Sequence, residues 1–209
     1  MATLSLGFAQ KNKSLYAWAS ALALITIFYN IAEGLVSVFF GLEDESMALF
    51  GFGLDSFVEV VSGIGIWHMV RRIRRNGGER PDRFEQTALR VTGTGFYILT
   101  AGLAITAAAY LYQGHKPETT FWGIIVSAVS IFSMWLLIHY KVKVGAGLGS
   151  QAILADAACT RACLRLSIVL LIASVGYELT GIGGIDSVCT LVIAGLCYRE
   201  GKKAKEKAK

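Results

Sequence analysis

Six apolar stretches divide the chain, and they constrain its fold more than any other feature of the sequence. They run over residues 15–40, 47–70, 88–112, 121–140, 148–177 and 185–198. A helix needs about 20 residues to cross about 30 Å of hydrocarbon, so six crossings would use most of the chain. Because 54% of the 209 residues are hydrophobic and only 17% are charged, one water-soluble core could not bury this apolar surface. We therefore expect an all-α, polytopic membrane protein with six transmembrane helices.

Basic residues gather at alternate connections between these stretches. The amino terminus and residues 71–83, 141–143 and 199–209 are rich in lysine and arginine, whereas the intervening connections are acidic or nearly neutral. Because membrane proteins keep basic loops in the cytoplasm, this alternation predicts that both termini are cytoplasmic. We interpret the net charge of +5 as a topology signal, and we expect no nucleic-acid partner.

The same pattern predicts the organisation of the chain. Residues 1–14 form a cytoplasmic amino-terminal segment, residues 15–198 form the six-helix transmembrane domain, and residues 199–209 form a basic cytoplasmic tail. The basic stretch 71–83 contains two adjacent glycines and a proline, which indicate a loop. Glycines inside the apolar stretches predict close packing between helices; they lie at positions 63, 65, 93, 95 and 102.

Ionisable side chains interrupt three of the predicted spans. They are Glu33 in the first span, Asp55 and Glu59 in the second, and Asp156, Arg161 and Arg165 in the fifth. An ionisable group at the centre of a transmembrane helix costs at least about 2.5 kcal/mol, and such groups usually face a cavity or a partner. Each of these residues is therefore a candidate functional residue.

Two pairs of potential metal ligands share a four-residue spacing. Asp55 and Glu59 lie on one helix face, at depths of about 12 and 18 Å from the outer end. Cys159 and Cys163 also share a face, and Cys159 lies about 16 Å from the inner end when counted from Leu148, which is level with the carboxylates. Two thiolates and two carboxylates form a four-coordinate set that suits Zn²⁺ or Cd²⁺. We therefore predict a metal site at these four residues.

Each pair also has a plainer interpretation. Cysteines in a membrane helix are often small packing residues, and the two carboxylates could instead bind an arginine structurally. Arg161 lies about 200° around the helix from Cys159, so it points away from the cysteine face. We therefore expect Arg161 and Arg165 to pair with another helix, for example at Glu33, or to line a subunit contact.

The remaining cysteines and histidines receive no functional role. Cys189 and Cys197 lie in the last stretch without a ligand-type spacing, so we interpret them as packing residues. His68 and His139 lie near helix ends, and His115 lies in a polar connection. We interpret all three as interfacial or solvated side chains.

The paired motifs resemble those of the cation diffusion facilitator, or cation efflux, family of divalent-metal transporters. That family carries His or Asp followed four residues later by Asp in its second helix, where this chain has Asp55 and Glu59. Its fifth helix carries His and Asp with the same spacing after Ala-Asp, where this chain has Cys159 and Cys163. Asp186 matches an Asp that recurs ahead of the family's last helix. The likeness covers most of the six-helix portion.

The resemblance implies transport and no enzymatic activity. It implies export of zinc or a similar divalent metal ion from the cytoplasm by alternating access, with protons as the counter-ion. Glu33 and Asp156 are candidates for supporting the ligands or carrying protons. We expect a multi-pass protein of a prokaryotic inner membrane. We expect the chain to lack the family's usual cytoplasmic carboxy-terminal domain, in which it would be similar to the small vesicular zinc-binding transmembrane proteins, and we therefore expect a homodimer to be held within the bilayer.

Two other functions remain open at this point. A membrane protein that binds or senses a metal without moving it would show stoichiometric binding and no flux. A thiol redox protein would use Cys159 and Cys163, but cysteines four apart in a regular helix rarely reach the dihedral angle of a disulfide.

Overall fold

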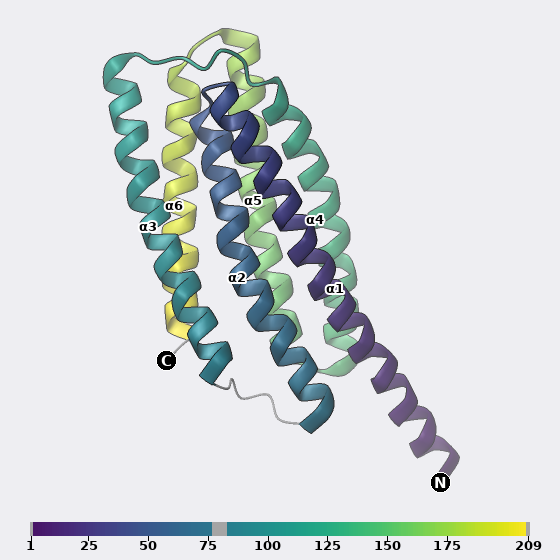
Figure 1. Cartoon of the computed structure of the whole chain (residues 1–209). Coiled ribbons are helices and arrows are strands. Elements are labelled where there is room, and N and C mark those ends of the chain that lie inside the picture. Colours follow the sequence, from purple (N-terminus) through teal and green to yellow (C-terminus); the bar gives the residue numbers. More distant parts are fainter. Residues whose placement is uncertain (1, 77–82, 208–209) are drawn as a thin grey trace.

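The computed structural model describes residues 2–76 and 83–207, which form an all-α bundle of six long helices (Figure 1). The helices are α1 (Ala2–Glu43), α2 (Met47–Asn76), α3 (Arg83–Gln113), α4 (Phe121–Leu148), α5 (Gln151–Thr180) and α6 (Gly184–Lys207). Five of them, α1 to α5, are long and apolar enough to cross a membrane. In α6 the apolar stretch is short and is flanked by Asp186 and Arg199. The prediction of an all-α, multi-pass membrane protein is confirmed.

The helices extend further than the apolar stretches that predicted them. We expected the fourth span to close at Lys141 and Lys143, but α4 continues to Leu148. Lysine is a good helix former, and the helix ends only where Gly149 adopts a left-handed conformation, with φ of 63°. Consequently α5 begins at Gln151 and not at Leu148. The predicted loop glycines and proline at positions 77, 78 and 81 lie outside the described residues.

Helices α2 and α5 form the centre of the bundle. Helix α2 packs against α1, α3, α5 and α6, and α5 packs against α2, α4 and α6. Helices α3 and α6 lie side by side at one edge, and α1 and α4 lie at the other (Figure 1). The two chain ends lie at the same end of the bundle (Figure 1). Side chains on α2 therefore meet neighbours from several helices.

Glycines bring α1 and α2 close together. A Cβ atom on Gly41 would lie 2.5 Å from the Phe50 backbone nitrogen, and one on Gly53 would lie 2.8 Å from the Val38 backbone nitrogen. The prediction of close packing was wrong for Gly102, which is exposed and whose Cβ would meet no atom of the described residues within 4 Å. Hydropathy alone does not show which face of a helix meets a neighbour.

Asp186 ties α6 to the beginning of α2. Its Oδ1 accepts a hydrogen bond of 2.8 Å from the Ser46 hydroxyl, and its Oδ2 accepts one of 3.0 Å from the Met47 backbone N–H. The Ala48 backbone N–H donates a further, longer bond of 3.4 Å. A carboxylate is favourable at this place, because the first N–H groups of a helix have no partner within the helix and carry partial positive charge. This contact fixes the start of the helix that bears Asp55 and Glu59.

Candidate metal site

The carboxylates of α2 point into the bundle. Asp55 is 2% exposed and Glu59 is partly buried, and they lie one turn apart on one face of α2. That face meets α1, α5 and α6. The spacing of the two acids therefore predicted their common direction correctly.

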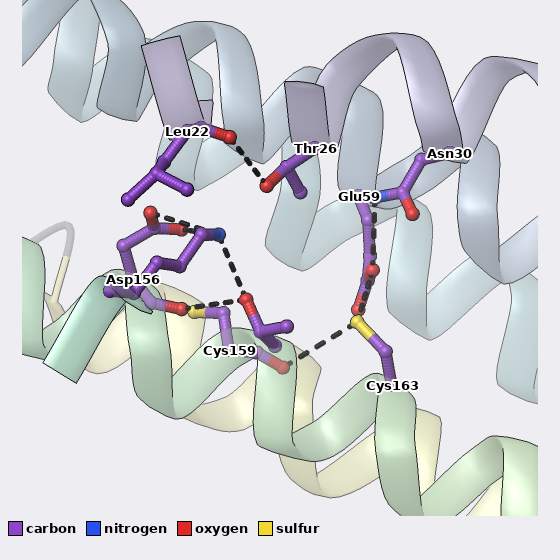
Figure 2. Close-up of polar contacts among 9 residues, drawn as sticks. Leu22, Thr26, Asn30, Glu59, Asp156, Cys159 and Cys163 are labelled. Carbon is purple, nitrogen blue, oxygen red and sulfur yellow. Dashed lines mark hydrogen bonds and ion pairs between the residues drawn. The ribbon is translucent and has the colours of Figure 1, made fainter. Parts of the chain in front are cut away.

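Glu59 contacts Cys163 of α5. The Cys163 thiol donates a hydrogen bond to Glu59 Oε2. Asn30 of α1 donates a hydrogen bond of 3.3 Å from its Nδ2 to the same oxygen. Figure 2 shows the Cys163 sulfur and the Asn30 amide meeting the carboxylate from opposite sides. One acid and one thiol of the predicted metal site are thus in direct contact.

The carbonyl oxygen of the Asn30 side chain is an unusual feature beside this contact. Asn30 is 1% exposed. Its Oδ1 accepts no hydrogen bond from any residue that the structure describes. A buried acceptor without a partner costs free energy comparable to that of a lost hydrogen bond. A cation bound at Glu59, or a proton donor there, would satisfy this oxygen.

Asp55 contacts a cysteine that the sequence analysis did not select. The Cys197 thiol of α6 donates a hydrogen bond of 3.3 Å to Asp55 Oδ1, and Cys197 is fully buried. We had interpreted Cys197 as a packing residue because its spacing from Cys189 is not that of a ligand pair. Spacing along one helix gives no information about a partner on another helix. Its depth gave no indication either, since Cys197 is the penultimate residue of the apolar stretch 185–198.

Cys159 lies one turn away from the acids in this structure. Its side chain points back along α5 toward Asp156, whereas the Cys163 sulfur points to Glu59 (Figure 2). The levels of the two helices thus differ from our expectation by about one turn, roughly 6 Å. We had counted depth from Leu148, but α5 begins three residues later, at Gln151. Within residues 2–76 and 83–207, no three His, Cys, Asp or Glu side chains are grouped closely enough to hold a metal ion.

Glu33 is held by hydroxyl groups from two helices. Its Oε1 accepts a hydrogen bond of 2.9 Å from Tyr29, and its Oε2 accepts one of 3.1 Å from Ser56 of α2. Because Ser56 is adjacent to Asp55, Glu33 lies beside the candidate metal site. We had considered an arginine of α5 as the partner of Glu33, but the hydroxyl groups occupy that role.

The two arginines of α5 lie on the outside of the bundle. Arg161 and Arg165 are both exposed. Arg161 lines an open pocket of about 500 Å³ whose other lining residues all belong to α4, namely Trp135, Ile138, His139, Val142 and Lys143. Arg161 therefore points away from the carboxylates of α2, as its position on the helix predicted.

Asp156 forms a buried ion pair with Lys141 of α4. The Lys141 Nζ lies 3.0 Å from both carboxylate oxygens of Asp156 and donates a hydrogen bond of 2.9 Å to Thr160 Oγ1. Lys141 is 1% exposed. The sequence analysis missed this role, because Lys141 at the end of an apolar stretch was interpreted as a topology signal. Its long side chain instead reaches the neighbouring helix.

The electrostatics distinguish the acids near the site from Asp156. Among the ion pairs of the described residues, none involves Glu33, Asp55 or Glu59. These three acids receive hydrogen bonds only from hydroxyl, thiol and amide groups. Because an ionised carboxylate inside a protein is costly without a cation, the cluster requires either bound protons or a bound metal ion. It therefore has the chemistry of a cation site.

Comparison with known protein families agrees with this chemistry. A family model of the cation efflux transmembrane domain matches residues 20–201, which include all the acids and thiols described above. No curated protein matches the chain. The family match spans most of the 209 residues, and the family's members are cation transporters and not enzymes. The chain therefore belongs to the cation efflux family of membrane transporters.

Proposed function

We propose that the chain moves zinc, cadmium or a similarly soft divalent ion across the membrane in exchange for protons, through a site of Asp55, Glu59, Cys159 and Cys163. Thiolate ligands favour such ions over Mg²⁺ or Ca²⁺, which take oxygen ligands. The observation that carries the proposal is the direct contact between Glu59 and Cys163. It brings a hard and a soft donor together in the middle of the bundle, beside the Asn30 oxygen that accepts no hydrogen bond from the described residues.

Coupling to protons follows from the donors themselves. A thiol binds a metal only as a thiolate, so the metal must displace the proton that Cys163 now donates to Glu59. The carboxylic acids exchange their protons for the metal in the same way. Metal and protons therefore compete for one set of atoms, and a more acidic compartment favours release of the metal. We propose that the direction is export from the cytoplasm, as membership of the cation efflux family implies.

Flux of Zn²⁺ or Cd²⁺ into proteoliposomes across a pH gradient tests this proposal. We expect Glu59→Gln and Cys163→Ser to lose most of the flux, because each removes a donor whose contact the structure shows. Cys189→Ser is the matched control, since Cys189 packs against the apolar core between the helices, and it should retain wild-type flux. Unchanged flux in Glu59→Gln would contradict the proposed site.

The same preparation distinguishes transport from binding alone. A metal-binding or sensing protein that does not transport would bind Cd²⁺ stoichiometrically in detergent but would show no flux with or without the gradient. Flux that does not respond to the gradient would contradict proton exchange and leave metal transport standing.

We also propose that the chain acts as a homodimer. Exposed arginines within an apolar helix are costly in lipid, and Arg161 and Arg165 lie on the outer face of α5. A second copy covering this face would remove them from lipid. Light scattering of the protein in detergent measures the mass, and a monomer at all concentrations would contradict the proposal.

A further inference from the structure

The last helix supplies a thiol to the acid cluster. Cys197 of α6 is fully buried, and its sulfur lies 3.3 Å from Asp55 Oδ1. Cys197 belongs to the buried apolar core, and Cys189, two turns earlier on α6, is only partly buried and packs against the same core. A cysteine that serves only to fill space behaves as a small hydrophobic residue and needs no hydrogen bond to a carboxylate. Cys197 therefore differs from Cys189 in its burial and in its contact with an acid.

The contact repeats the arrangement found one turn further along α2. There Glu59 receives the thiol of Cys163 from α5, and here Asp55 receives the thiol of Cys197 from α6. Helices α5 and α6 both pack on α2 and on each other. The acid face of α2 is therefore flanked by one sulfur from each neighbouring helix. The result is a set of two carboxylates and two thiols contributed by three helices.

A second observation, beside Glu59, points to a cation as the ligand of this cluster. The Asn30 oxygen is buried and accepts no hydrogen bond from the described residues, and its amide nitrogen is bound to Glu59. Neither Asp55 nor Glu59 forms an ion pair among those residues. An oxygen acceptor without a donor and two acids without a cation are both satisfied by a bound cation.

We propose that Cys197 is a ligand of the transported metal ion and that α6 thereby contributes to the site together with α2 and α5. This inference rests on the proposed function, in which a soft divalent ion is the substrate. On binding, the S–H bond of Cys197 breaks and a sulfur–metal bond forms. The proton leaves toward water, and no electron is transferred in this step. The ion is held between the Asp55–Cys197 and Glu59–Cys163 contacts, so Cys197 takes the place that the proposed site gave to Cys159, which lies one turn from the acids.

Metal binding requires the two contacts to close on one ion. Asp55 and Glu59 are separated by about 6 Å of helix rise, and the four donors form two separate contacts in the present structure. Glutamate has three side-chain torsions, so its carboxylate can move toward Asp55 without a shift of the backbone. The start of α2 is already fixed to α6 through Asp186, which keeps Asp55 and Cys197 at matching levels.

Cadmium spectroscopy of the full chain in detergent tests this proposal, because the sulfur-to-cadmium absorption band and the ¹¹³Cd chemical shift both report the number of sulfur ligands. Cys197→Ser and Cys197→Ala should each lose one sulfur from the wild-type count and bind Cd²⁺ at least about tenfold more weakly. The matched control Cys189→Ser should keep the wild-type count and affinity. A wild-type count in a folded Cys197 variant overturns the inference.

A double variant without Cys159 and Cys189 keeps the test decisive if both Cys197 variants fail to fold. The sequence has four cysteines, so Cys159→Ser/Cys189→Ser retains only Cys163 and Cys197. A two-sulfur signal from this chain supports Cys197 as a ligand, and a one-sulfur signal overturns it. Wild-type protein that shows no sulfur-to-cadmium band at all contradicts the proposed function itself. The two failures are therefore distinguishable.

Discussion

The buried ion pair between α4 and α5 allows a quantitative test of how the bundle is stabilised. The Lys141 Nζ lies 3.0 Å from both Asp156 oxygens and 2.9 Å from Thr160 Oγ1, and Lys141 is 1% exposed. Removing one partner of such a pair leaves the other charge buried and costs about 3–5 kcal/mol. We therefore expect Lys141→Met to lower the free energy of unfolding by this amount. In the double variant Lys141→Met/Asp156→Leu, most of the loss should disappear, because no charge remains buried.

Unfolding in mixed detergent micelles, followed by tryptophan fluorescence, measures these free energies as a double-mutant cycle. Lys143→Met is the matched control, because Lys143 is two residues further along α4 and is exposed, so its loss should cost less than about 0.5 kcal/mol. A loss from Lys141→Met as small as that of the control would refute the reasoning. So would a double variant whose loss equals the sum of the two single losses.

Three further predictions concern the bundle ends and the helix contacts. Asp186→Ala should lower the free energy of unfolding by at least about 2 kcal/mol, measured in the same assay, because the start of α2 loses its carboxylate acceptor. Asp44 lies beyond the end of α1, and burial, with the charges of Glu43, Glu118 and Glu178, raises the pKa of its carboxyl. The folded protein thus binds this proton more tightly than the unfolded chain, so stability falls as pH rises through the raised pKa. Asp44→Asn should therefore raise the melting temperature at pH 8 more than at pH 4, and an equal change at both would contradict the sign. Gly41→Ala should destabilise the bundle because its Cβ would lie 2.7 Å from the Phe50 Cα, whereas the control Gly102→Ala should be neutral or mildly stabilising. Melting temperatures of the two variants decide this, and equal losses would contradict it.

The sequence predicted the elements well because hydropathy is a local property. Each apolar stretch became a helix, and the four-residue spacing of Asp55 and Glu59 placed both on the interior face of α2. Which residues of α2 share that face follows from helix geometry alone. The ends of the helices were less predictable, because lysine and arginine continue a helix beyond the hydrocarbon as readily as they mark its boundary.

The pairing between helices could not be predicted to within one turn. The level of Cys159 and Cys163 depends on where α5 begins, and that point depends on the left-handed Gly149 at the end of α4. An error of three residues shifts a helix by about 4.5 Å, which is most of a turn. Such a shift exchanges the cysteine that faces Glu59. The contacts of Lys141 and Cys197 were also missed. Each partner lies on another helix, and spacing along one helix does not predict it.

The way in which each buried acid is neutralised separates structural from functional carboxylates in this protein. Asp156 is compensated by Lys141, and Asp186 by the first N–H groups of α2, so both are satisfied by the chain itself. The acids around the candidate metal site, Glu33, Asp55 and Glu59, receive only neutral donors among the described residues. A lysine paired with these acids would compete with the metal ion for the carboxylate oxygens. The hydrogen bonds that the structure gives these three acids come from neutral groups, which leaves their carboxylates open to exchange protons for a metal ion.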